Sequence, residues 1–161
     1  MNQTHIHLLI THLPIIGSIL GTFVLVHGIG VKSNQTIIAA YYIFVLSSIG
    51  AIIAYLTGEG AEETVENIQG VVETTIKIHG NFAIFALISL IILGLASVVG
   101  LFLTWKNAPL TRTTAFIILF LSLISFGLAA RTGYLGGQIR HTEIGNGATV
   151  PSENSEKEDN D

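Results

Sequence analysis

Six histidines are the residues of this chain best suited to bind a metal ion or a haem iron, and they are unevenly distributed. Three of them open the chain, at His5, His7 and His12 in T-H-I-H-L-L-I-T-H-L-P. An imidazole that faces hydrocarbon is costly unless it is paired, hydrogen-bonded or bound to a ligand. Cysteine is absent, which excludes thiolate ligation and leaves imidazole and carboxylate as the strong ligands. The opening segment therefore predicts a haem or metal redox site held by histidines.

Four long apolar runs must position these histidines. The runs cover residues 8–31, 37–57, 79–104 and 112–135, and only the last contains charged residues. Each is long enough, at about 1.5 Å per residue, to cross a hydrocarbon layer of about 30 Å. Backbone groups in lipid must be satisfied by hydrogen bonds, and no run alternates as a barrel strand would. We therefore predict an all-α membrane protein, a four-transmembrane-helix bundle with up-down-up-down topology.

Basic residues near the ends of the runs predict the orientation in the membrane. Lys32 lies between the first two runs, and Lys106 and Arg112 lie between the last two, with no acidic residue in either turn. Basic residues concentrate on the cytoplasmic side of membrane proteins. We therefore expect a multi-pass protein of the bacterial inner (cytoplasmic) membrane with both termini extracytoplasmic. His27 then lies near the cytoplasmic end, and the other five histidines lie near the outer face.

Two segments outside the runs have their own composition. Residues 59–78 combine acidic residues with Val and Ile at intervals of three to four, which predicts an amphipathic helix on the outer membrane surface. A solvated connector is the alternative. Residues 146–161 are polar, acidic and free of aromatic residues, which predicts a disordered tail. The expected organisation is a four-helix transmembrane domain over 1–145, followed by a disordered acidic tail over 146–161.

The two halves of the chain form a weak internal repeat of two hairpins. Each half has an outer histidine, a lysine in its turn and a Thr-Gly pair beside a tyrosine at its end: His12 and His79, Lys32 and Lys106, Thr57-Gly58 and Thr132-Gly133. If a twofold axis along the membrane normal relates the hairpins, their first helices lie diagonally opposite each other. His12 and His79 are then expected to face each other at similar depth. His7 lies about 140° from His12 around a helix, so the two are not expected to share a site.

Three motifs resemble those of a known family. They are H-L-L-I-T-H-L-P-I-I-G over 7–17, K-I-H-G-N over 77–81 and G-Y-L-G-G-Q-I-R-H-T-E-I-G over 133–145. They are similar to motifs of the bacterial four-helix membrane proteins catalogued as domain of unknown function 2231. The resemblance covers the chain except its acidic tail and implies no activity. It implies a four-span fold, with Leu8 where many members have proline and with these residues at the family's histidine positions: His7, His12, His79 and His141.

The histidines favour a membrane-bound b-type haem protein that transfers electrons. In this hypothesis His12 and His79 hold haem b between facing helices, and Arg131 or Arg140 binds its propionates. Electrons would pass between a membrane quinol and an extracytoplasmic redox partner or a larger membrane complex. The chain is then expected to be an electron carrier or redox subunit rather than a stand-alone enzyme.

Three alternatives fit the same residues. His7 and His141 could hold a second haem or a metal beside the first site. A non-haem metal ion could be bound by imidazole and carboxylate ligands drawn from a wider set: His7, His12, His79, His141, Glu59, Glu62 and Glu143. The chain could instead be a non-catalytic membrane subunit whose histidines satisfy one another.

Arg131 is the one charge inside the outer part of a span. It is expected to meet Glu59 or a propionate, or else to extend to the lipid headgroups. The other basic residues are few and dispersed, which argues against nucleic acid as a partner.

Overall fold

The computed structural model describes residues 3–66 and 73–140, and every regular element in those ranges is an α-helix. The helices are α1 Gln3–Ile10, α2 His12–Gly30, α3 Asn34–Glu66, α4 Glu73–Trp105 and α5 Thr111–Arg140. Four helical segments are long and apolar enough to cross a membrane: His5–Gly30, Asn34–Ala61, Glu73–Trp105 and Thr111–Ile139. The predicted all-α class and the four membrane-length helices are therefore confirmed, and the composition is that of a multi-pass membrane protein.

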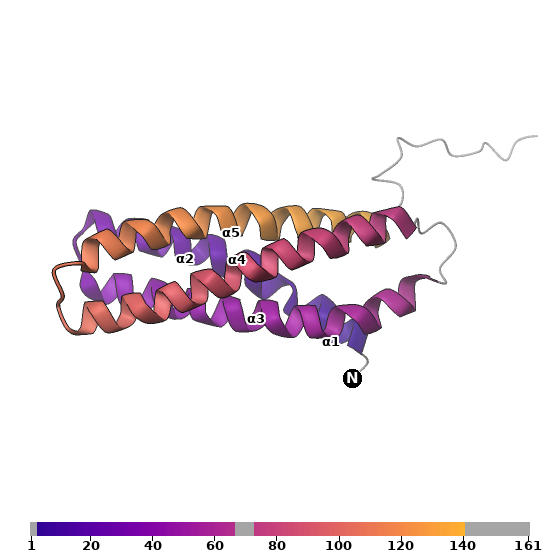
Figure 1. Ribbon diagram of the computed structural model, residues 1–161, viewed down its shortest axis with the longest axis horizontal. Helices are drawn as coiled ribbons and strands as arrows, with labels where there is room; N and C mark the ends of the chain where they lie inside the picture. Colours follow the sequence, from indigo (N-terminus) through magenta and orange to yellow (C-terminus); the bar gives the residue numbers. More distant parts are fainter. Residues whose placement is uncertain (1–2, 67–72, 141–161) are drawn as a thin grey trace, which may run out of the picture.

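The long helices lie side by side along the longest axis of the molecule (Figure 1). The short connections 31–33 and 106–110 lie at one end, which we call the turn end. Helix α1 and the start of α4 lie at the opposite end, which we call the histidine end because it carries His7 and His79. Helix α2 packs on α3 and α5, α4 packs on α3 and α5, and α1 packs mainly on α3. Each long helix therefore has two principal neighbours.

The turns are short because one residue in each adopts a left-handed backbone conformation. Lys32 has φ of 56° and Asn107 has φ of 48°. A left-handed residue after the last helical turn reverses the chain while later amides bond the last carbonyls. In the first turn the Ser33 amide donates to the Gly28 carbonyl at 3.0 Å. The Asn34 amide group donates to the Asn107 side-chain oxygen at 3.4 Å, which links the two turns.

The first apolar run is not one straight helix. A turn at Thr11 separates α1 from α2, and its cause is Pro14. Proline has no amide hydrogen for the carbonyl four residues earlier, here that of Ile10, and its ring crowds that carbonyl. Thr11 keeps helical dihedral angles, and its amide still donates to the His7 carbonyl at 3.0 Å, so the interruption is a bend rather than a loop. The bend lets α1 lean on α3, which decides where His7 lies.

The helices approach closely because small residues line their contacts. A Cβ added at Gly94 would lie 2.6 Å from the Ser48 hydroxyl oxygen, so only glycine fits there. The buried Thr22 hydroxyl donates to the Ser122 hydroxyl at 2.8 Å and joins α2 to α5. Such small-residue contacts and interhelical hydroxyl bonds are typical of helices that associate in lipid.

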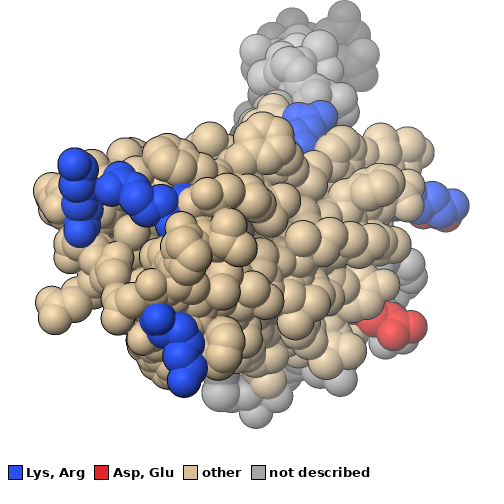
Figure 2. Space-filling view, turned by 60° about the vertical axis from the view of Figure 1, so that its left-hand side comes forward, with Lys and Arg blue, Asp and Glu red and all other residues tan. Residues whose placement is uncertain are grey.

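Large apolar side chains cover the outside of the bundle. Leu56 is 72 % exposed and Phe120 is 64 % exposed, as expected of residues that face lipid rather than water. Figure 2 shows a surface formed almost entirely by uncharged residues, with the few Lys, Arg, Asp and Glu side chains toward its edges.

The segment predicted as a separate surface helix, 59–78, is divided between two long helices. Helix α3 continues past Gly58 and Gly60 to Glu66, and α4 begins at Glu73. The two glycines do not end the helix because each costs only about 1 kcal/mol in a helix, and the Ala and Glu residues that follow favour helix. Residues 67–72 and the predicted tail, 146–161, lie outside the described residues.

Candidate functional site

Two histidines from opposite halves of the chain are held in the same way at the histidine end. The Nδ1–H of His7 in α1 donates to the Ala54 carbonyl of α3 at 2.8 Å. The Nδ1–H of His79 in α4 donates to the Thr132 carbonyl of α5 at 3.0 Å. A carbonyl oxygen only accepts, so Nδ1 carries the hydrogen in both rings, and in the neutral imidazole Nε2 keeps its lone pair. Both rings therefore present Nε2 as a ligand atom.

A glycine stands four residues after each accepting carbonyl, and the one that follows Thr132 makes room for the ring of His79. One helical turn after Ala54 stands Gly58, where an added Cβ would lie 3.5 Å from Cε1 of His7. One turn after Thr132 stands Gly136, where an added Cβ would lie 3.1 Å from Cε1 and 3.4 Å from Nδ1 of His79. Residues four apart lie one above the other on a helix. Each ring therefore lies over a bare stretch of its partner helix.

The two rings belong to one region of the molecule. Both side chains are half-buried, and both belong to elements that lie at the histidine end, α1 and the start of α4. His7 of α1 is fixed by α3, and His79 of α4 is fixed by α5. Thr57 supports the His7 side, since its hydroxyl lies 3.4 Å from Nδ1 of His7. Two oriented imidazoles at one end of the bundle are nitrogen donors of the kind that iron and several other metals bind.

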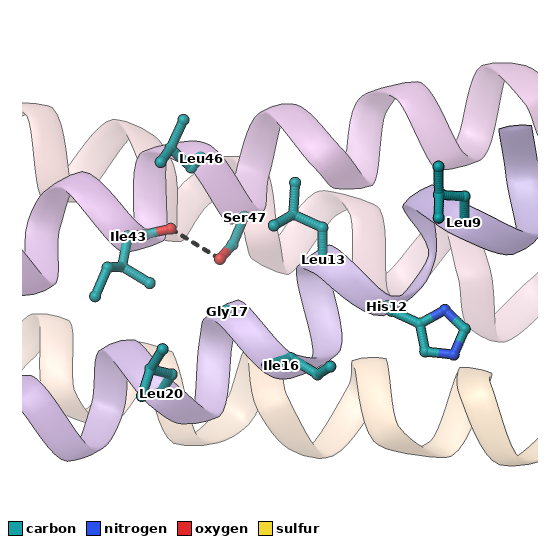
Figure 3. A pocket seen from close by; sticks show the side chains of 9 residues that line it. All are labelled: Leu9, His12, Leu13, Ile16, Gly17, Leu20, Ile43, Leu46 and Ser47. Atoms are coloured by element: carbon teal, nitrogen blue, oxygen red, sulfur yellow. Dashed lines mark hydrogen bonds between the residues drawn. The ribbon is translucent and has the colours of Figure 1, made fainter.

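His12 is placed elsewhere. Its ring is exposed, and its Nδ1–H donates at 2.9 Å to the carbonyl of Leu8, which lies one turn earlier, in α1. It lies at the end of an apolar cleft on the outside of α2 and α3 (Figure 3). The divergence of His7 and His12 was predicted, but the ring that turns toward the other helices is His7. The bend at Pro14 and the packing of α1 on α3 are the physical reason.

Arg131 meets aromatic rings and not Glu59. Its guanidinium carbon lies 5.7 Å from the centroid of the Phe82 ring and 5.5 Å from that of Tyr134, within the range of cation–π attraction. Among the side chains that the structure describes, the ion pair joins Lys77 to Glu73 at 2.6 Å. Arg131 immediately precedes Thr132, the residue whose carbonyl holds His79.

The larger metal-ligand set predicted from the sequence is not assembled in the described part of the chain. In residues 3–66 and 73–140, no group of three or more His, Asp or Glu side chains could hold a metal ion. His141 and Glu143 lie outside the described residues, as do the side chains of Glu62 and Arg140. The described site thus consists of two imidazoles.

Comparison with known proteins adds no relative: no family model, no curated protein and no solved structure matches the chain.

Proposed function

We propose that the protein is a membrane-bound b-type haem protein that transfers electrons, with His7 and His79 as the axial ligands of the iron. The observation that carries this proposal is the matched support of the two rings, each with Nδ1–H on a carbonyl and Nε2 free. Imidazole ligands of metals commonly donate their other N–H to a carbonyl or carboxylate, which fixes the ring and increases its basicity. A pair of such rings on different helices of a bundle suits a haem.

The number of ligands favours haem over a non-haem ion. A structural zinc site takes four protein ligands and a catalytic one usually takes three. Haem iron already has four porphyrin nitrogens, so two protein nitrogens would be enough to hold it, and His7 and His79 would be those residues. A third imidazole or carboxylate near the pair would reverse this preference, and none is found among the described side chains.

The residues around the rings have separate roles in the proposal. The Ala54 and Thr132 carbonyls orient the imidazoles and make them stronger electron donors, which stabilises the oxidised iron. Gly136 lets the His79 ring lie close against α5, whereas at Gly58 a Cβ would make an ordinary contact with His7. Arg131, held between two aromatic rings, is the cation available to a propionate. A haem held there would accept and release one electron at a time.

The proposed membrane arrangement is an up-down-up-down bundle with both termini on the extracytoplasmic side of a bacterial inner membrane. The basic residues Lys32, Lys106 and Arg112 belong to the turn end, as the positive-inside rule requires of a cytoplasmic face. The equivalent supports of His7 and His79 favour two related hairpins. We also propose membership of the family catalogued as domain of unknown function 2231, on the strength of the three motifs.

The test is a visible spectrum of the purified protein in detergent, before and after dithionite. A haem protein shows a Soret band that sharpens and shifts on reduction, and His7→Ala and His79→Ala are each expected to abolish it. His12→Ala and His27→Ala are the matched controls, because both rings are exposed, and they are expected to keep the full spectrum. A colourless protein with one bound zinc or copper per chain would support the non-haem alternative. A colourless, metal-free protein would refute both.

A further inference from the structure

A cleft on the outer surface of α2 and α3 leads to His12. Its volume is about 370 Å³, within the range of sites that bind small ligands. Its walls are apolar side chains such as Leu13, Leu20 and Leu46, and His12 stands at the end nearer the histidine end (Figure 3). Gly17 and Ser47 form part of the lining, and the Ser47 hydroxyl donates to the Ile43 carbonyl at 2.8 Å. His12 is therefore the one ionisable residue of this lining.

The hydrogen bond of His12 determines which partner its free nitrogen can take. Nδ1–H is committed to the Leu8 carbonyl at 2.9 Å, so Nε2 of the neutral ring is an acceptor. A group that binds there must donate a hydrogen bond. Of the two redox forms of a membrane quinone, the carbonyls of the oxidised form only accept, whereas a quinol hydroxyl donates.

We propose that this cleft binds an isoprenoid quinol, with a ring hydroxyl donating to Nε2 of His12 and the apolar tail between α2 and α3. The cleft opens toward the lipid, in which such a molecule dissolves, and its polar group is at one end, as the ligand's is. This site would locate the electron donor and in that sense rests on the proposed electron transfer. The binding itself requires no haem.

His12 is close to the haem ligand in the chain but turned away from it. It lies five positions after His7, about 7.5 Å along a helix. Their rings bond to carbonyls on different helices, Leu8 of α1 for His12 and Ala54 of α3 for His7. The quinol site and the haem site would therefore lie on opposite sides of one bent helical segment.

The test is anaerobic titration calorimetry with ubiquinol-2 and ubiquinone-2, which share a head and two isoprene units, against the protein in nanodiscs of dioleoylphosphatidylcholine. Wild type is expected to bind ubiquinol-2 about fivefold more tightly than ubiquinone-2, the difference of one hydrogen bond. His12→Phe is expected to bind both forms equally, because it keeps an aromatic ring without the acceptor. Leu20→Trp, which fills the cleft, is expected to bind neither. His27→Phe, an exposed position on the same helix, is the control.

Two results would overturn the inference. One is a preference for ubiquinol-2 that survives in His12→Phe. The other is loss of binding in wild type when dioleoylphosphatidylglycerol replaces half of the lipid, which would mean that a membrane lipid occupies the cleft. Haem-free His7→Ala is expected to bind ubiquinol-2 as wild type does. A wild-type protein without haem that still binds quinol through His12 would therefore refute the proposed function and leave the quinol site standing.

Discussion

Alanine substitutions at Gly136 and Gly58 can distinguish the effect of the histidine's hydrogen bond on haem binding from the effect of the glycine on helix stability. At Gly136 an alanine Cβ would lie 3.1 Å from Cε1 and 3.4 Å from Nδ1 of His79, so the ring must move. A shift of ~0.4 Å would lengthen the 3.0 Å bond to the Thr132 carbonyl beyond the usual limit of about 3.2 Å. The lost bond is worth about 1 kcal/mol, a fivefold change, and loss of such support typically weakens metal binding 10–100-fold. We expect Gly136→Ala to weaken haem binding about tenfold.

Gly58→Ala is the matched control for this experiment. Its Cβ would lie 3.5 Å from His7, an ordinary contact, so haem affinity is expected to change less than twofold. Both substitutions favour the helix by about 1 kcal/mol, so neither variant should melt below wild type. The assay is titration of the haem-free protein with haem, followed at the Soret band, with thermal unfolding in the same detergent. Equal affinities of the two variants would refute the proposed support of His79 by Thr132.

The remaining predictions concern the bend and the close contacts of the bundle. Pro14→Ala restores the amide that the Ile10 carbonyl lacks, so the first span should straighten and His7 should turn away from α3. Most bound haem should then be lost, with no fall in melting temperature. Full haem content in this variant would contradict the role of the bend. Gly100→Ala would place a Cβ 2.7 Å from the buried Tyr41 ring and should cost about 1–3 kcal/mol of unfolding free energy, measured by denaturation in mixed micelles. Gly127→Ala, with nothing within 4 Å, should instead stabilise by up to about 1 kcal/mol, and equal effects at the two glycines would argue against this packing.

The spans could be predicted from the sequence because hydropathy measures what lipid requires. Its limit is the membrane surface, where α3 and α4 continue as helices through polar residues, to Glu66 and from Glu73. Helices predicted from the apolar runs alone are therefore shorter than the observed helices α3 and α4. The bend between α1 and α2 was available in the sequence as Pro14, ten residues into a span, but its direction depends on how α1 packs on α3.

The site was predicted in part. The 100° rotation per residue correctly separates His7 from His12, but it does not say which of them faces the other helices. The repeat identified His79 but paired it with His12, whose exposed ring bonds to the Leu8 carbonyl of α1. The accepting carbonyls of Ala54 and Thr132 have no sequence signature, because every residue has a carbonyl. The glycines four residues later, Gly58 and Gly136, were the available signal.

The length of α4 determines how far the proposed haem is from water. The helix has 33 residues, so it is about 50 Å long, whereas the hydrocarbon layer measures about 30 Å. If Trp105 lies at one interface, His79, 26 positions earlier (105 − 79), lies about 39 Å away, farther than the hydrocarbon layer is thick. His12, 18 positions before the end of α2 (30 − 12), lies about 27 Å from the turn end of that helix, which is less than the thickness of the hydrocarbon layer. A reductant dissolved in the lipid could thus approach the protein at His12, and an oxidant dissolved in water could approach the proposed haem near His79.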